Sequence, residues 1–258
     1  MTKLIDTHCH LDFPLFDEDR VEVIARAKQN NIEKIIIPSI TQQYWQRVDE
    51  IQQRYPENLL VAYGLHPMFM SHHKKEHINL LDKKLSEGKA IAIGECGLDF
   101  YYGGLGQSHA NVQIEYFDLQ LKLAKKYNLP VIIHARKSID TVLKMLRQYG
   151  GLTGVIHSFS GSLQQAEYCI KEGFLLGFGG PITYPRATKL RALVTILPIE
   201  KLVLESDAPD QVGQSHYGKR NEPAYLTDTL EVMAELKELS TAYVAQQTTT
   251  NIKDVLAQ

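Results

Sequence analysis

Six side chains that can bind metals or transfer protons stand where short apolar segments of this chain end. They are His8, His10, Glu95, His134, His157 and Asp207. Imidazole and carboxylate are the ligand types that zinc and manganese accept, and carboxylate also suits magnesium. If the fold gathers these segment ends, the six side chains can hold two divalent metals around a water molecule. That arrangement is typical of a metal-dependent hydrolase.

The spacing of the histidines favours such a centre. His8 and His10 are two positions apart, and residues i and i+2 of an extended chain face the same side, so both imidazoles can reach one metal. An HxH pair by itself is a weak signal, because two ordinary polar histidines would look the same. His134 and His157 each end an apolar run, and we expect them to bind a second metal rather than to be satisfied core residues.

The acidic residues are given different roles. Glu95 follows an apolar run, where an uncompensated carboxylate would be costly, so we expect it to bridge two metals or, as the alternative, to form a buried ion pair. We choose Asp207 as the general base, since it would face the water. Glu205 should share the face of Asp207 and either orient a ligand histidine or form a structural pair. Asp99, in a glycine-rich segment, is interpreted as a turn residue.

Other histidines are less informative. His66 ends a third apolar run and could contact a substrate phosphate or act as a ligand. A polar stretch further on is expected to be a solvated helix start, and its histidines are left out of the site: His72, His73 and His77.

Short β-branched runs recur along the chain, with amphipathic segments between them, as in βα units around a parallel sheet. The runs are 4–6, 34–39, 59–64, 90–95, 130–135, 154–159, 174–179 and 201–206. Segments with helical periodicity are 20–30, 43–55, 77–88, 113–127, 139–149 and 163–173. This pattern predicts a single (β/α)8 TIM barrel over residues 1–258, with the active site at the C-terminal ends of the strands. A doubly wound open sheet also alternates strand and helix, but its one crevice cannot easily unite the ends of five strands.

Composition narrows the classes of function. The chain has 258 residues, 44% of them hydrophobic and 22% charged, and no apolar run approaches the roughly 20 residues of a membrane span. Without a tripartite leader before the first histidines, we expect a cytoplasmic protein. Three cysteines without a CxxC pair favour reduced thiols, and we interpret Cys9 and Cys96 as packing residues. The net charge of −2 argues against a broad basic face, so any contact with nucleic acid must be local.

Seven motifs occur in the order DTHCHLD, GLHP, GECGLDFY, HAR, HSFSG, LESDAP and RNEP. Over essentially the whole chain they resemble the TatD family of metal-dependent deoxyribonucleases within the amidohydrolase superfamily, and especially its bacterial subgroup of metal-dependent hydrolases. The resemblance implies a TIM barrel, two divalent ions and hydrolysis of ester bonds, with 3′ to 5′ exonuclease activity on DNA or RNA. It assigns His8, His10 and Asp207 to one metal, His134 and His157 to the other, and Glu95 between them.

A nuclease also needs cations for phosphates and aromatic rings for bases. Two long loops, 96–112 and 207–223, together with the end of the fifth apolar run, offer Arg136, Lys219, Arg220, Tyr101, Tyr102 and Tyr217. We expect 96–112 to be a structureless wall or lid of the site, and the substrate to be single-stranded or bound by its end. A small-molecule amidase, lactonase or deacylase on the same metal ligands is the alternative, and a non-enzymatic metal-binding protein is a third reading. The sequence leaves the metal, the physiological substrate and the oligomeric state open.

Overall fold

The computed structural model describes residues 3–101 and 106–257, with the side chains of 106–108 left out. Its eight strands form one parallel sheet in the order β1 to β8. They are β1 (Leu4–Asp6), β2 (Ile32–Ser39), β3 (Leu59–Tyr63), β4 (Ala92–Asp99), β5 (Val131–Arg136), β6 (Gly154–Ile156), β7 (Phe174–Phe178) and β8 (Leu202–Leu204). Each strand pairs with its successor along the chain, without the reversal of strand order that defines a doubly wound sheet.

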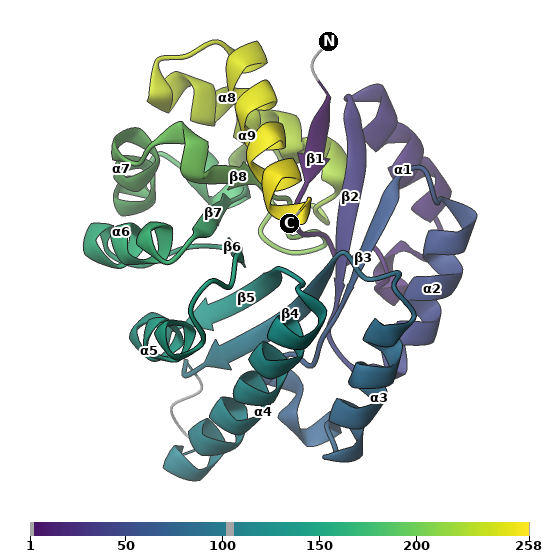
Figure 1. The fold of residues 1–258 in the computed structure, drawn as a ribbon. Helices are drawn as coiled ribbons and strands as arrows, with labels where there is room; N and C mark the ends of the chain where they lie inside the picture. The colour runs from purple at the N-terminus through teal and green to yellow at the C-terminus, as the bar shows by residue number, and fades with distance from the viewer. Residues whose placement is uncertain (1–2, 102–105, 258) are drawn as a thin grey trace.

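The two ends of this sheet meet. The backbone N–H of Thr7 donates to the carbonyl of Leu204 at 3.1 Å, and that of Asp207 donates to the carbonyl of His8 at 2.8 Å. These bonds join the segments that leave β1 and β8, so the sheet is a near-closed barrel. The predicted TIM-barrel fold is therefore confirmed (Figure 1).

Helices cover the outside of the barrel and, in the case of the last one, its N-terminal end (Figure 1). They are α1 (Arg20–Gln29), α2 (Trp45–Arg54), α3 (Glu76–Ser86), α4 (Gly106–Tyr127), α5 (Ile139–Tyr149), α6 (Leu163–Lys171), α7 (Thr188–Ile196), α8 (Leu226–Lys237) and α9 (Thr241–Leu256). In α5, for example, Val142, Leu143, Met145 and Leu146 are buried, the stripe that helical periodicity predicts. One expectation was wrong: 96–112 is not structureless, because β4 continues to Asp99 and α4 begins at Gly106.

A ring of apolar side chains, one from each strand, fills the lower part of the barrel. The ring consists of Ile5, Ile36, Ala62, Ala92, Ile132, Val155, Leu175 and Val203, and Ile252 and Val255 of α9 pack against it. The amide of Asn251 donates to the carbonyls of Ile199 and Leu202 at 2.8 Å, near the start of β8. Helix α9 therefore closes the N-terminal end of the barrel and leaves the other end for a site.

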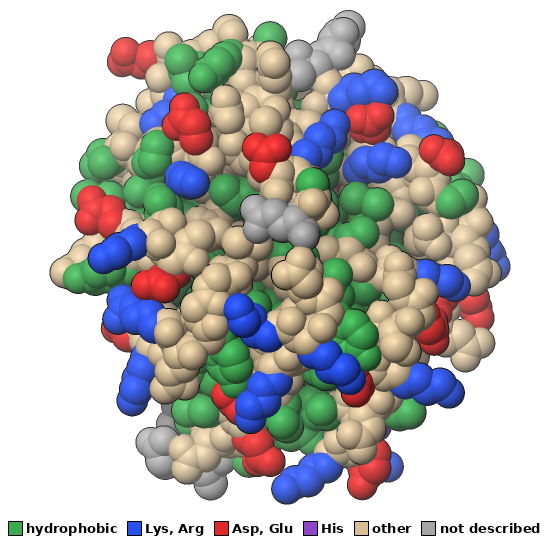
Figure 2. All heavy atoms as spheres, in the orientation of Figure 1, with side chains coloured by type: hydrophobic (Ala, Val, Ile, Leu, Met, Phe, Trp, Pro, Cys, Tyr) green, Lys and Arg blue, Asp and Glu red, His purple; other side chains and the backbone are tan. Residues whose placement is uncertain are grey.

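The face seen in Figure 2 mixes Lys and Arg with Asp and Glu side chains. This mixture agrees with the small net charge of −2. Within the described part of the chain, the structure contains no helix with the length and apolar character needed to cross a membrane.

Candidate metal centre

Above the apolar ring, toward the C-terminal ends of the strands, the barrel interior is lined by polar side chains. Side chains two positions apart on a strand share a face, and several candidate residues follow a ring residue by two or four positions. His134 follows Ile132 within β5, and His157 and Glu205 follow Val155 and Val203 just beyond the ends of β6 and β8, while His66 and Asp207 lie in the loops after β3 and β8. The candidate site is therefore the continuation of the barrel interior at the C-terminal ends of the strands.

Glu95 departs from this alternation, as does His8, which lies three positions after the ring residue Ile5. Glu95 lies three positions after the ring residue Ala92, which on a regular strand would turn it away from the interior. The register between β4 and β5 shifts between Ile93 and Cys96. Irregularities of this kind redirect side chains and are common beside active sites. The shift therefore accounts for the inward position of Glu95, whose side chain is almost fully buried.

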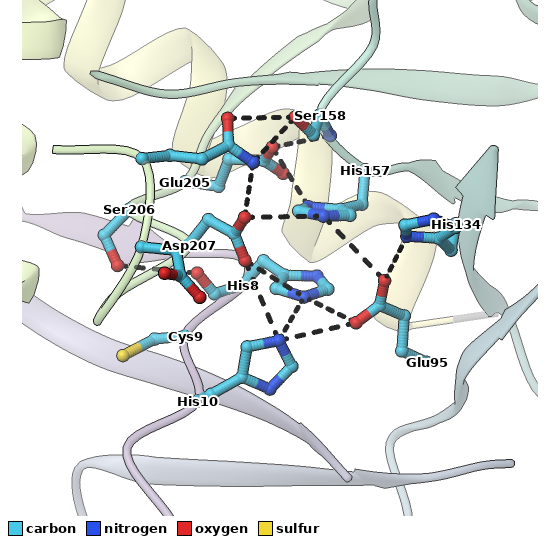
Figure 3. Close-up of polar contacts among 12 residues, drawn as sticks. His8, Cys9, His10, Glu95, His134, His157, Ser158, Glu205, Ser206 and Asp207 are labelled. Carbon is cyan, nitrogen blue, oxygen red and sulfur yellow. Dashed lines mark hydrogen bonds and ion pairs between the residues drawn. The ribbon is translucent and has the colours of Figure 1, made fainter. Parts of the chain in front are cut away.

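The carboxylate of Glu95 lies between two groups of imidazoles (Figure 3). Its Oε2 is 3.0 Å from His8 Nε2 and 3.5 Å from His10 Nε2. Its Oε1 is 2.9 Å from both His66 Nε2 and His134 Nδ1. Each oxygen thus faces a different pair of ring nitrogens.

Asp207 lies on the side of the cluster that faces β8. Its Oδ1 is 3.7 Å from the Nε2 atoms of His8 and His10, and its Oδ2 is 3.8 Å from His157 Nε2. The side-chain amide of Gln211 donates to Oδ2. Asp207 therefore shares His8 and His10 with Glu95 and approaches them from the β8 side.

Three overlapping groups in this cluster bring ligand atoms within 4.8 Å of one another: His8, His10 and Glu95; His8, His157 and Asp207; His66, Glu95 and His134. Ligand atoms about 2.0–2.1 Å from a tetrahedral ion are about 3.3 Å apart, and the contacts given above are 2.9–3.8 Å. Nitrogen and oxygen donors of this kind suit zinc and manganese. The residues present fit divalent metal ions.

Two further carboxylates orient the imidazoles. Asp99 Oδ2 is 2.9 Å from His134 Nε2, which leaves Nδ1 of that ring directed at Glu95. Glu205 Oε1 is 3.1 Å from His157 Nδ1, which leaves Nε2 for the centre. Carboxylates in this position fix the tautomer and orientation of ligand histidines. The interpretation of Asp99 as a turn residue was incomplete, because its Oδ1 accepts the N–H of Tyr101 while Oδ2 contacts His134.

Burial and the neighbouring charges shift the pKa values of the cluster in both directions. Burial opposes ionisation of Glu95, but the imidazoles of His66 and His8 hold its pKa well below the usual value. Burial also opposes the imidazolium form of His157, yet Glu205 and Asp207 outweigh it and raise the pKa of His157 to about 10. Burial raises the pKa of Asp207 to about 6, although His157 and His10 oppose that shift. The carboxylates thus favour positive charge on His157, whereas burial lowers the pKa of His8 and His66.

Gly177 of β7 makes room for Glu205. A Cβ at Gly177 would lie 2.1 Å from Glu205 Oε2 and 2.7 Å from its Cδ, whereas the carboxylate also accepts the N–H of Ser158 through Oε1 at 2.6 Å. Strand β7 therefore contributes space rather than a ligand, and this space sets the position of the carboxylate beside His157.

We expect Gly177→Ala to lower the free energy of unfolding by about 1–3 kcal/mol, the usual cost of overpacking a core. For a chain of this size each kcal/mol lowers the unfolding midpoint by about 2–4 °C, which calorimetry would detect. Combining it with Glu205→Asp, which shortens the opposing side chain, should cost less than the two single changes added together. Strict additivity of the two would show that Gly177 and Glu205 do not compete for this space.

The structure gathers all six side chains that the sequence placed in the site, and it sets His66, which the sequence offered as a ligand or a phosphate contact, beside Glu95. The division between two metals stays a prediction: His157 stacks on His8, with ring centroids 3.6 Å apart, whereas His134 lies closer to His66. The expectation of a solvated start was wrong for His73 and His77, which are buried. His73 Nε2 lies 2.9 Å from the carbonyl of His66 and so supports the loop that carries His66.

The candidate substrate contacts are distributed unevenly. Arg136 lines the cavity above the centre, and its guanidinium lies 3.7 Å from the ring centroid of Tyr101. Arg220 pairs with Asp19 at 2.7 Å instead, while the exposed Lys219 and Tyr217 do not line that cavity. Tyr102 lies outside the described residues.

Sequence reasoning missed several residues that shape this end of the barrel. Asp6 is buried and accepts the N–H groups of His8 and Ser206 at 3.2 and 2.9 Å, which ties the ends of β1 and β8 together. Ser158 and Gln211 hydrogen bond to each other and, like Asp207, have positive φ angles of 46°, 52° and 54°. Such backbone conformations cluster at functional sites. A carboxylate directly after an apolar run was the signal that could have identified Asp6.

Comparison with known proteins supports this picture. The family described as TatD-related DNase matches residues 5–257. An uncharacterised metal-dependent hydrolase of Escherichia coli K12, YjjV, is 39% identical over 247 residues, which cover 95% of this chain and 94% of YjjV. The corresponding protein YabD of Bacillus subtilis 168 is 36% identical, with 97% of each chain covered.

The solved structure of YjjV superposes with a TM-score of 0.92 and 37% identity, covering 99% of this chain and 98% of that one. The family match spans nearly the entire barrel, including every residue of the cluster described above. The chain therefore belongs to the family of TatD-related DNases.

Proposed function

We propose that this protein is a metal-dependent hydrolase of phosphodiesters that removes nucleotides from the 3′ end of single-stranded DNA. The observation that carries the proposal is the placement of Glu95, whose two carboxylate oxygens face separate pairs of imidazole nitrogens at 2.9–3.5 Å. A carboxylate in that position is suited to link two cations. The family description, TatD-related DNase, supports the choice of substrate.

The proposed ligands divide around Glu95. His8 and His10 would hold one cation with Asp207, and His134 and His157 the other, while His66 would act as a further ligand or as a contact to phosphate. When bound, a pair of divalent cations supplies Lewis-acid stabilisation of phosphoryl charge and lowers the pKa of a water molecule. Carboxylates at Asp99 and Glu205 keep the relevant ring nitrogens of His134 and His157 directed at the centre.

Asp207 is proposed to accept the proton of the attacking water. Its carboxylate contacts three imidazoles of the cluster, and its side chain also lines the cavity of about 500 Å³ above the centre. A general base must lie within hydrogen-bond reach of the proton that it removes and have a suitable pKa. The amide of Gln211 donates to Asp207 Oδ2, so one carboxylate oxygen is held in place while the other faces His8 and His10, which follow β1.

The test uses a 5′-labelled single-stranded oligonucleotide with purified protein and added Mg²⁺, Mn²⁺ or Zn²⁺. We expect a ladder of products shortened from the 3′ end, and little turnover of an amide and lactone panel. The matched control is the same oligonucleotide with phosphorothioate linkages at its 3′ end, which should block the ladder, whereas the same linkages at the 5′ end should not. Efficient amide or lactone hydrolysis without nucleotide release under any of these metals would replace the nuclease proposal with the small-molecule one.

A further inference from the structure

A second cavity adjoins the one above the metal centre. Its volume is about 520 Å³, close to the 500 Å³ of the first. Ala135, Arg136 and Ser160 line both cavities, so the two hollows meet where β5 ends and where the loop after β6 begins. The two cavities are therefore neighbours that share one wall.

The wall shared by the two cavities carries the guanidinium of Arg136. Arg136 is the last residue of β5 and pairs with Asp99 of β4, and its carbonyl accepts the N–H of Phe100 at 2.9 Å. Its guanidinium lies over the ring of Tyr101, 3.7 Å from the centroid. A guanidinium stacked in this way retains its in-plane N–H donors, which suit a phosphate group. The guanidinium of Arg136 is therefore positioned to bind a phosphate group between the two cavities.

The rest of the second cavity adds positive charge and aromatic surface. Lys137 is exposed, lines this cavity and has a φ of 58°, a backbone conformation that few non-glycine residues adopt. Tyr101 lines it as well and is 53% exposed. The one carboxylate among its described lining residues, Asp140, accepts a hydrogen bond from Gln165 at 2.8 Å. Two cations and a tyrosine beside a phosphodiester centre are features of single-strand binding sites.

We propose that this second cavity is the subsite for the nucleotide next to the scissile phosphate on the strand that remains bound. This inference rests on the proposed function of the metal centre. The phosphate of that nucleotide contacts Arg136 and Lys137, and its base contacts the exposed part of the Tyr101 side chain. Stacking and charge contacts of this type tolerate any base, so the subsite selects for a nucleic-acid strand and not for a sequence.

The test compares two phosphodiesters. A single-stranded oligonucleotide is long enough to reach both cavities, whereas bis(p-nitrophenyl) phosphate contains no nucleotide that could occupy the second. We expect Arg136→Gln to lower kcat/KM for the oligonucleotide by about 10-fold to 100-fold, the usual effect of losing a charged hydrogen bond. That loss should exceed the loss on the small diester at least tenfold and lie mainly in KM. Tyr101→Leu should likewise lower kcat/KM for the oligonucleotide more than for the small diester.

The matched control is Arg186→Gln. Arg186 also lies over a tyrosine, 5.2 Å from the ring centroid of Tyr184, but lines neither cavity, and its loss should change neither substrate by more than about twofold. Equal losses on both diesters for Arg136→Gln, or no loss on either, would overturn the subsite.

A binding measurement separates the subsite from the proposed function. If the wild-type protein cleaves neither diester, the nuclease proposal fails, and fluorescence anisotropy of the labelled oligonucleotide then tests the subsite alone. A dissociation constant at least tenfold weaker for Arg136→Gln than for Arg186→Gln supports it. Equal affinities, or no binding by the wild-type protein, would overturn it.

Discussion

Glu95→Gln is expected to abolish the proposed activity, with a loss of at least about 10³-fold in kcat/KM, because bound metals contribute several kcal/mol of charge stabilisation. The change keeps the volume of the side chain but removes its charge from between two imidazole pairs. We expect the metal content, measured by mass spectrometry of the loaded protein, to fall to one ion per chain or fewer.

Glu167→Gln provides the matched control, since Glu167 is an exposed carboxylate on α6. Its metal content and kcat/KM should equal those of the wild-type protein. Thermal unfolding of both variants checks that the barrel is intact. An unchanged metal content in Glu95→Gln would remove Glu95 from its role between the two cations.

Asp207→Asn is expected to lower kcat by about 10² to 10⁴-fold, the usual contribution of a positioned general base. Asparagine keeps an oxygen that can accept the hydrogen bond from Gln211 but cannot take the proton of the attacking water. The ratio of the wild-type kcat to the variant kcat should fall as the pH rises, because hydroxide then replaces the missing base. A pH profile of kcat for both proteins measures this ratio.

Asp210→Asn is the corresponding control. Asp210 is exposed, lies three residues further along the same loop and lines the same cavity, so the two variants make the same change of charge nearby. We expect its kcat to stay within about threefold of the wild-type value, as for most surface substitutions. A wild-type rate for Asp207→Asn, or an equal loss for Asp210→Asn, would exclude Asp207 as the base.

The sequence predicted the strands because their apolar runs are buried on both faces of the barrel wall. The run 130–135, for example, corresponds to β5 at Val131–Arg136. Once the runs were placed, parallel strands required that their C-terminal ends meet. His134 and His157 could then be predicted to lie close together, and their rings are 6.3 Å apart.

What the sequence could not supply depends on contacts between distant residues. The inward turn of Glu95 needs the register shift between β4 and β5, which no local pattern encodes. Arg220 looks like a phosphate contact until its pairing with Asp19, 201 residues away, is known. The burial of His73 likewise results from tertiary packing, because its polar neighbours in the sequence predict a solvated position.

The junction between β1 and β8 has a consequence for how the protein is made. The bonds from Thr7 to Leu204 and from Asp207 to His8 connect segments about two hundred residues apart, and such contacts form slowly because a long loop must close. Since synthesis proceeds from the N-terminus, His8 and His10 leave the ribosome long before Asp207. A nascent chain that stops before β8 therefore lacks Asp207, and the metal centre is complete only after most of the chain has been synthesised.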